Sequence, residues 1–383
     1  MKKLWHFEGL RCILVIVVFL HHFAAAFYPA MIFGLQQFGH SPWERWVYAT
    51  PLAVVLDGRL AVFVFFVLTG FFIIHERNTS TRNITVWRFT VSRYFRLVLP
   101  SLASTVLAYI FIRLGTVANV GAAQITRSPW LSNVLPSHPN LVTAITEGVQ
   151  SPWSTQIVTY NFNLWPIQMF FIGSLVIFLL SRWWKRGTVR TLGWAAIALI
   201  SIGTQFASFF LGALLADLFS ALTNRNRPTL SWAAVASGVM LGFFTLLLGS
   251  VPTMFNSIFA PGTSPATMNV VFNTVAAGLI VSGVLLSHGW QRILSRPPLV
   301  AIGQMSFSLY VIHLLVIATV STNIFLAVTP YLAYDGAVAV TFALTVIAVA
   351  IVTPPFYRYV ERPSHRLAEK IKIPPEQNNA PDR

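Results

Sequence analysis

The chain has 383 residues, of which 55% are hydrophobic and only 10% are charged. A soluble domain carries about 25% charged residues, so this composition excludes an ordinary water-soluble protein. The formal net charge is +15. The basic residues lie between apolar runs, which indicates membrane topology rather than nucleic-acid binding.

Ten apolar segments approach the length of about 20 residues that a helix needs to cross a bilayer. They lie at 9–29, 52–74, 95–114, 160–181, 189–203, 205–222, 229–250, 269–288, 305–328 and 333–356. The fifth segment is short, and few residues separate it from the sixth. The sequence therefore predicts an all-α integral membrane protein of about ten transmembrane helices. We expect one domain over residues 1–372 and a disordered cytosolic tail at 373–383.

The distribution of Lys and Arg predicts the orientation of these spans. With the N-terminus in the cytosol, 22 of the 26 Lys and Arg residues fall in cytosolic segments. The four on the other side are Arg45, Arg59, Arg113 and Arg127. This asymmetry follows the positive-inside rule and requires an even number of spans. Both termini are therefore expected in the cytosol, and the protein in an endomembrane or the plasma membrane.

The first span contains FLHHFAAAFY, with His21 and His22 inside the apolar run. Ionisable residues at membrane depth are costly and usually functional. Each helical residue turns by about 100°, so Arg11 and His22 share one face, about 16 Å apart along the axis, and His21 is rotated away by about 80°. An amphiphilic ligand fits this line, with its anion at Arg11 and its reactive end at His22. The alternative is that Arg11 snorkels and His22 bonds a neighbouring helix.

A second basic pair precedes the third span. Arg93 and Arg96 are three residues apart in VWRFTVSRYFRLVLP, so on a helix they lie on one side. Paired guanidinium groups suit phosphate, because each offers a planar fork of donors. The alternative is the positive-inside rule alone.

The ninth span carries three polar residues on one face. Ser306, Tyr310 and His313 follow an i, i+4, i+7 spacing in GQMSFSLYVIHLLVI. Such a stripe on an apolar helix indicates either the lining of a site or polar contacts between helices. In the second span, Thr69-Gly70 is expected to serve close helix packing. Asp217, at the cytosolic end of the sixth span, is expected to snorkel to the interface.

Two connecting segments carry further predictions. Asn78-Thr79-Ser80 and Asn83-Ile84-Thr85 are N-glycosylation triplets in a predicted cytosolic loop, so we expect neither asparagine to be modified. The longest outside segment is about 116–159. Loops of this length are often functional or disordered. This one is either a lid over an outward-facing opening or a plain connection.

Five motifs in chain order resemble those of the membrane acyltransferase-3 family. They are FEGLRCILVIVVFLHHF at the N-terminus, FFVLTGF at 65–71, SRYFRLVLP at 92–100, IGQMSFSLYVIH at 302–313 and YVERPSHRL at 359–367. Together they extend from residue 7 to about 367. Each motif alone is weak, but five in the family's order are specific. Residues 1–372 thus resemble one acyltransferase-3 transmembrane domain, closest to fungal members around Trp165.

The resemblance implies about ten transmembrane helices and transfer of an acyl group, often acetyl, from coenzyme A to a hydroxyl. It implies that Arg11 and His22 are the family's Arg-His pair and that Arg93 and Arg96 are its cytosolic arginines. We expect these arginines to bind acyl-CoA and His22 to act as the general base. Tyr310 or His313 is expected to orient His22 or to stabilise the oxyanion.

The expected partners follow from this reaction. They are the lipid bilayer, acyl-CoA (acetyl-CoA first) as co-substrate and a hydroxylated small-molecule, sugar or lipid acceptor. No nucleic acid, no metal and no permanently bound cofactor is expected.

One position departs from the family pattern. The family usually carries a glutamate five residues after the tryptophan of its fourth-span motif, and here that position is Phe170. Gln168 is offset by two residues and so points about 160° away on a helix. The departure leaves two alternatives open, a transporter or flippase of hydroxylated metabolites and a catalytically degenerate family member.

Overall fold

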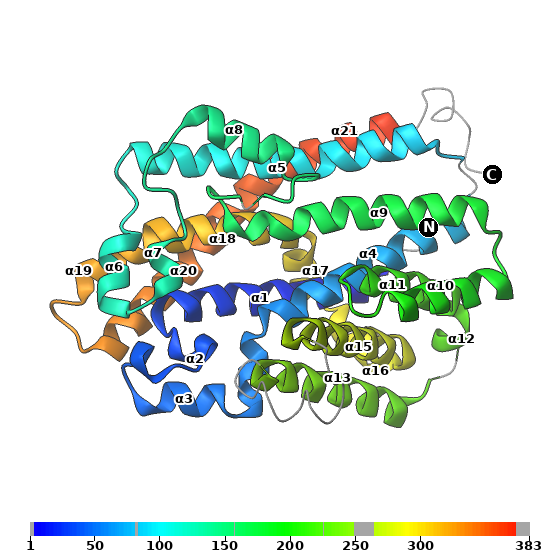
Figure 1. The fold of residues 1–383 in the computed structure, drawn as a ribbon, viewed down its shortest axis with the longest axis horizontal. Coiled ribbons are helices and arrows are strands. Elements are labelled where there is room, and N and C mark those ends of the chain that lie inside the picture. Colours follow the sequence, from blue (N-terminus) through cyan, green and yellow to red (C-terminus); the bar gives the residue numbers. More distant parts are fainter. Residues whose placement is uncertain (1–3, 81–82, 157, 225, 249–263, 373–383) are drawn as a thin grey trace. The chain divides into compact units, whose positions relative to one another are not determined.

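The computed structural model describes residues 4–80, 83–156, 158–224, 226–248 and 264–372. The predicted tail at 373–383 lies outside the described residues. Within them every regular element is a helix and none is a strand (Figure 1). The prediction of an all-α membrane protein is therefore confirmed.

Eight helical segments of the described chain are long enough and apolar enough to cross a membrane. They contain α1 (Trp5–Phe27), α4 (Gly58–Thr79), α5 (Val86–Arg113), α9 (Trp165–Trp183), α13 (Pro228–Leu248), α15 (Pro265–Leu286), α18 (Ser306–Val316) with α19 (Thr322–Val328), and α20 (Tyr334–Phe356). The other two predicted spans correspond to α10 (Thr188–Ile200) and α11 (Phe206–Asp217), which have only 13 and 12 residues. At 1.5 Å per residue each is about 20 Å long or less, against a hydrocarbon core of about 30 Å. The number of spans and the cytosolic position of both termini stay predictions.

The start of α4 lies later than the sequence predicts. The predicted span begins at 52, but Pro51–Leu56 forms a short 3-10 helix, η2, and α4 begins at Gly58. The cause is a cap, because the Asp57 carboxylate accepts a hydrogen bond of 2.9 Å from the Leu60 N–H.

Two other helices run beyond their predicted apolar spans. α5 begins at Val86, nine residues before the predicted 95, and its 28 residues are about 42 Å long. The last helix continues from α20 through a π-helical segment, η5 (Tyr357–Glu361), into α21 (Arg362–Lys372). Its 39 residues exceed the length that a bilayer needs. The additional turns are basic, which is why hydropathy alone did not include them.

The chain divides into two compact units, each built from three stretches of sequence. The first unit takes the described residues within Met1–Ala24, Ala30–Thr81 and Val176–Ser306, and the second those within Ala25–Pro29, Arg82–Leu175 and Phe307–Arg383. Neither unit corresponds to one continuous segment. The prediction of one domain over 1–372 stays a prediction.

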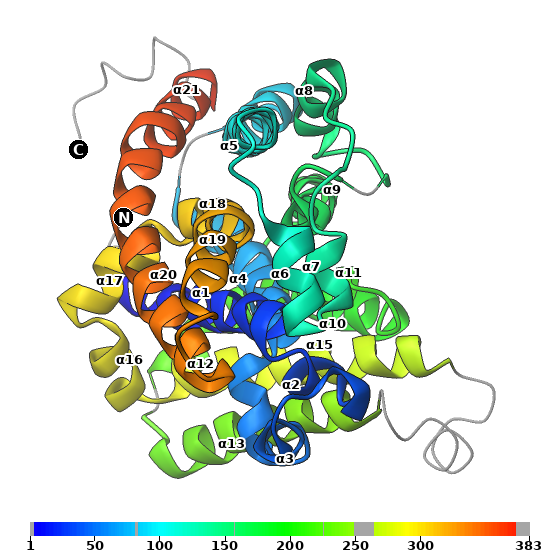
Figure 2. The ribbon, with the colours of Figure 1, turned by 90° about the vertical axis from the view of Figure 1, so that its left-hand side faces the viewer.

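In the first unit, α4 packs closely on α11, and α13 lies along α15 (Figures 1 and 2). A Cβ added at Gly70 would lie 2.0 Å from the Phe209 carbonyl oxygen, and one at Gly212 would lie 1.9 Å from that of Val67. No side chain fits there, so glycine allows the two backbones to touch. The packing role predicted for Thr69-Gly70 is thus confirmed.

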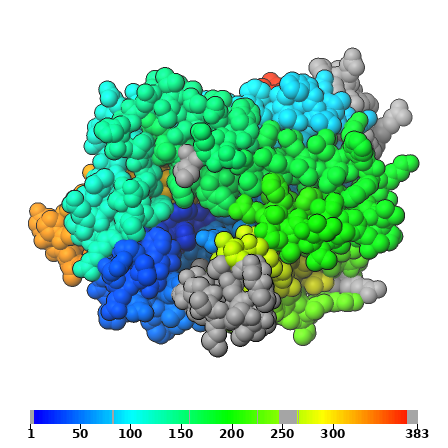
Figure 3. All heavy atoms as spheres, in the orientation of Figure 1, coloured from blue at the N-terminus to red at the C-terminus, as the bar shows by residue number. Residues whose placement is uncertain are grey.

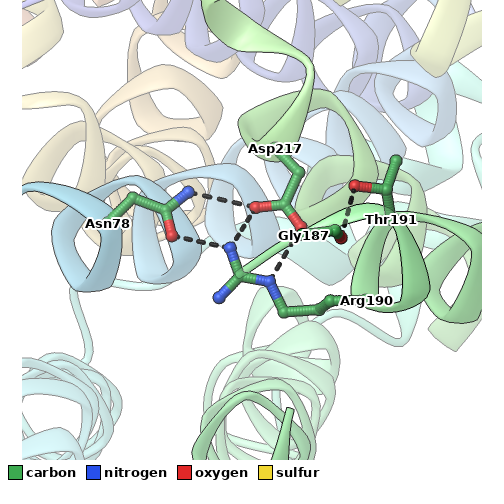
Figure 4. A network of polar contacts seen from close by, with 5 residues as sticks. All are labelled: Asn78, Gly187, Arg190, Thr191 and Asp217. Atoms are coloured by element: carbon green, nitrogen blue, oxygen red, sulfur yellow. Dashed lines mark hydrogen bonds and ion pairs between the residues drawn. The ribbon is translucent and has the colours of Figure 1, made fainter. Parts of the chain in front are cut away.

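A buried polar cluster joins α4, α10 and α11 (Figure 4). The Arg190 Nε donates to Asp217 Oδ2 at 2.9 Å, and its Nη2 forms an ion pair with Asp217 Oδ1 and donates to Asn78 Oδ1 at 2.7 Å. The Asn78 Nδ2 donates to Asp217 Oδ1 at 3.0 Å. Asp217 is nearly fully buried, so the snorkelling interpretation was wrong. Its partner is on another helix, 27 residues away.

The same cluster bears on glycosylation of Asn78. Its side-chain nitrogen, the atom that would carry a glycan, is within hydrogen-bond distance of Asp217. A glycan there would separate the carboxylate from its amide donor. This contact supports the expectation that Asn78 is unmodified.

In the second unit, α5 lies between α21 and α8 (Leu141–Gln150) (Figure 2). The long segment 116–159 contains α6 (Asn119–Thr126), α7 (Pro129–Ser132) and α8. The teal and green atoms of its described residues form part of the face that Figure 3 shows. These residues are folded, and the choice between lid and connection stays open.

We predict that Arg190→Ala destabilises the protein strongly, because it leaves Asp217 buried without its cation. Removing one partner of a buried pair costs about 3–5 kcal/mol. Thermal unfolding in detergent measures the change, with Arg186→Ala as a control on an exposed residue of the same connection. A variant Arg190→Ala that unfolds within about 1 °C of wild type contradicts this prediction.

Candidate functional site

Arg11 lies in the second turn of α1 and is half-buried. Its Nη1 is 3.3 Å from Glu8 Oε2, and its guanidinium carbon lies 4.8 Å from the centroid of the Phe72 ring. Glu8 is therefore an internal partner that an anionic ligand would have to share or displace. Because Glu8 lies one turn toward the N-terminus, these contacts leave the snorkelling alternative open.

The helical face between Arg11 and His22 is covered by protein. Val15 and Val18 lie on this face, and they are 0% and 1% exposed. A ligand that follows α1 from Arg11 to His22 would have to displace these two side chains. The two ends of the predicted line lie on one helix, but the line between them is packed in this structure.

The hydrogen bond of His22 determines which ring nitrogen carries the lone pair. Its Nδ1 is 2.9 Å from the Val18 carbonyl oxygen, which only accepts hydrogen bonds. We therefore assign the proton of neutral His22 to Nδ1 and the basic lone pair to Nε2. The half-buried ring thus has its basic nitrogen on the side away from its own helix backbone.

His21 is attached to a different element. Its Nδ1 is 2.7 Å from the Leu56 carbonyl oxygen, at the end of η2. A Cβ added at Gly58 would lie 2.9 Å from His21 Cγ, so the ring fits against the first residue of α4. The two imidazoles meet edge-on, with centroids 5.1 Å apart. His21 therefore joins α1 to the start of α4, which leaves His22 as the better catalytic candidate.

Tyr310 and His313 are brought together in the second unit by Asn163. The Asn163 Nδ2 is 3.1 Å from His313 Nε2, and the Tyr310 hydroxyl donates to the Asn163 carbonyl oxygen. Both side chains are buried. The shared neighbour confirms that they face one way on α18.

This geometry also assigns the tautomer of His313. Its Nδ1 is 2.9 Å from the Leu309 carbonyl oxygen and so carries the proton. The lone pair on Nε2 accepts the Asn163 amide hydrogen. In this structure both Tyr310 and His313 are engaged by protein groups, which fits a positioning role better than proton transfer.

Arg93 and Arg96 both lie on α5 and are half-buried. Between them, Tyr94 donates to the Val149 carbonyl oxygen at 3.2 Å and stacks on Trp153 at 4.7 Å between centroids. Nearby, Arg88 Nη1 donates to the Ile371 carbonyl oxygen at 3.2 Å. The basic end of α5 is thus held on two sides, by α8 and the residues after it and by α21.

Two asparagines that sequence reasoning did not select hold this part of the second unit together. Besides Asn163, the buried Asn161 donates to the Val311 carbonyl oxygen at 2.9 Å and to Ser104 Oγ at 3.1 Å. Both precede α9 in the stretch YNFNLWP. The sequence feature that could have identified them is a pair of side-chain amides next to an apolar span, where burying a polar group carries a high free-energy cost.

The position of the family glutamate carries no carboxylate. Phe170 is half-buried on α9. Gln168 points elsewhere, as its offset predicts, and its Nε2 lies 3.4 Å from the Trp153 carbonyl oxygen. No side chain from these two positions supplies the missing negative charge.

A separate cavity of about 190 Å³ lies along α8. Its lining is Val142, Thr143, Thr146, Glu147, Gln150, Ser154, Gln156 and Val158. The Glu147 carboxylate accepts hydrogen bonds from the Thr159 hydroxyl at 2.7 Å and the Tyr160 N–H at 3.0 Å. None of the six candidate residues lines this cavity.

Asp57, in the turn just before the α4 span, is an unusual carboxyl group. It is 2% exposed, and loss of hydration raises its pKa to about 6. The Leu60 N–H, the nearby Arg59 charge and the Thr245 hydroxyl oppose this rise. The ionised form therefore carries an unfavourable burial cost.

We predict that Asp57 makes the protein less stable as pH rises from about 4 to about 6. The folded state binds the proton more tightly than the unfolded state, so protonated Asp57 stabilises the fold. This stabilisation is fully present at a pH below the pKa of the unfolded state, and it is lost as the pH rises past the pKa of the folded state. Asp57→Asn keeps the oxygen that caps Leu60 but does not titrate. Melting temperatures in detergent across this range should fall less steeply for the variant. Parallel curves for the two proteins contradict the prediction.

Comparison with known proteins gives one match. A family model described as an acyltransferase domain, Acyl_transf_3, matches residues 5–354. No curated protein and no solved structure matches the chain. The matched range covers all the candidate residues described above.

Proposed function

We propose that this chain, which belongs to the acyltransferase-3 family, transfers an acyl group from acyl-CoA to a hydroxyl group. Family membership makes it a membrane acyltransferase. The acetyl group, the coenzyme A donor and the hydroxylated acceptor are our proposal. The observation that carries it is the family match over 5–354. The matched range includes His22, to whose Nε2 we assign the basic lone pair.

His22 acts as the general base in this proposal. Its Nε2 takes the proton of the acceptor hydroxyl while the oxygen attacks the thioester carbonyl carbon. The tetrahedral intermediate collapses as its C–S bond breaks, which forms the ester. The leaving coenzyme A sulfur receives the proton from His22. Imidazole suits this role, because its reference pKa near 6.5 leaves it mostly neutral at pH 7.

The donor binds through arginines. Arg93 and Arg96 lie on the basic end of α5, on the predicted cytosolic side, where acyl-CoA is available. Their guanidinium groups bind the phosphates by charge-assisted hydrogen bonds. Arg11 binds the same donor if the phosphate displaces Glu8 from its 3.3 Å contact. Tyr310 and His313 position reacting groups through Asn163.

Phe170 favours a second candidate function. The absence of the family glutamate favours, as the alternative, a transporter or flippase of hydroxylated metabolites or a family member that has lost activity. Neither alternative requires the protein to bind acyl-CoA. Donor binding therefore separates the proposal from both.

We predict that the purified protein binds acetyl-CoA and coenzyme A saturably in calorimetric titrations. Arg93→Ala/Arg96→Ala should weaken binding at least tenfold, because each charge-assisted hydrogen bond contributes about 1.5–3 kcal/mol. Arg11→Ala should weaken it less, because Glu8 competes for that arginine. Arg113→Ala, an exposed arginine at the other end of α5, is the matched control and should bind as wild type does.

No binding of either compound to folded protein at millimolar concentration contradicts the proposal and favours transport or loss of activity. Equal losses from Arg113→Ala and the double variant would show a general charge effect, which contradicts the assigned donor site.

A further inference from the structure

Glu361 is a buried carboxylate that the proposed mechanism does not use. It is the last residue of the π-helical segment η5, in YVERPSHRL, and only 2% exposed. Its Oε2 accepts a hydrogen bond of 2.9 Å from the Ser308 N–H and a second from the Ser308 hydroxyl. Single π-helical turns inside α-helices often occur at functional sites.

The two bonds lie at the start of α18. Ser308 is the third residue of that helix, and its N–H is one of the first-turn donors that have no partner within the helix. A negative charge at this end also interacts favourably with the helix dipole. Glu361 thus caps α18 from a different helix, 53 residues further along the chain.

The bonds of Asn161 and Asn163 hold α18 further along its length. Asn161 binds the Val311 carbonyl oxygen, and Asn163 binds the side chains of Tyr310 and His313. Glu361 therefore holds the first turn, just before the residues that Asn163 orients. A shift or rotation of that turn would move both side chains.

Burial of the carboxylate needs this compensation. Oε2 has both Ser308 bonds, and Oε1 lies 3.5 Å from His365 Nε2, one turn further along its own helix. A carboxyl group in such a place is favourable only when its hydrogen bonds are well formed. A residue that served packing alone would need no polar group here.

We propose that Glu361 is a positioning residue for acyl transfer, which holds the first turn of α18 so that Tyr310 and His313 are correctly placed. This proposal rests on the proposed function of the chain.

The test compares Glu361→Ala and Glu361→Gln in detergent, with Ser364→Ala as the matched control. Ser364 is also buried, on α21, and its hydroxyl donates to the Glu361 backbone carbonyl oxygen one turn earlier rather than to α18. Acetyl-transfer kinetics give kcat and the KM for acetyl-CoA. Hydrogen exchange of peptides within 302–312 measures the first turn of α18 without any need for activity.

Glu361→Ala should lower kcat at least about tenfold and leave the KM for acetyl-CoA within about threefold, because the donor arginines are untouched. It should also speed exchange in 302–312. Glu361→Gln keeps an oxygen that accepts from Ser308, so it should retain most of the wild-type kcat and of the protection from exchange in 302–312. Ser364→Ala should match wild type in kcat and in exchange.

The proposal is overturned if Glu361→Ala leaves kcat within about twofold of wild type. It is also overturned if exchange in 302–312 is unchanged, or if the loss is in KM alone. If Glu361→Ala does not fold, Glu361→Gln is measured in its place. The proposal is then overturned if Glu361→Gln loses both activity and protection from exchange while Ser364→Ala keeps both, because the glutamine oxygen should still accept from Ser308. If wild type transfers no acetyl group, the proposed function fails, and the exchange measurement alone decides whether Glu361 holds α18.

Discussion

Hydrocarbon offers no hydrogen bonds, so each polar side chain within these apolar helices needs a partner from the protein. The side-chain amide of Asn163 meets this need for His313, and its backbone carbonyl oxygen meets it for Tyr310. The Glu361 carboxylate meets it for the first turn of α18. Each bond also fixes the rotation of a helix whose apolar surface could pack in several ways. The polar contacts thus decide which side chains face one another, while apolar burial supplies most of the packing.

The same constraint explains why two neighbouring histidines differ. Each donates a hydrogen bond from Nδ1 to a backbone carbonyl oxygen. The acceptor of His21 is Leu56 on another element, whereas the acceptor of His22 is Val18 on its own helix. The bond of His22 to Val18 therefore leads us to assign the basic lone pair of this candidate base to Nε2.

Local pattern was sufficient to predict eight of the ten spans, because apolar runs and helical spacing are properties of neighbouring residues. It was also sufficient to place Tyr310 and His313 on one face. It did not predict the partners Arg190 and Asp217, because nothing in either helix specifies the other. Asn163 and His313 are likewise 150 positions apart. Helix ends such as the one capped by Asp57 depend on single side-chain bonds that hydropathy does not detect.

The most direct test is to follow labelled acetyl groups from acetyl-CoA in membranes that contain the wild-type chain, His22→Ala or His21→Ala. The account predicts that label enters a hydroxylated membrane or metabolite fraction with wild type and with His21→Ala, but not with His22→Ala, while all three proteins are present in equal amounts. Equal labelling by wild type and His22→Ala would contradict the role of His22, and absence of label with every chain would contradict acyl transfer itself.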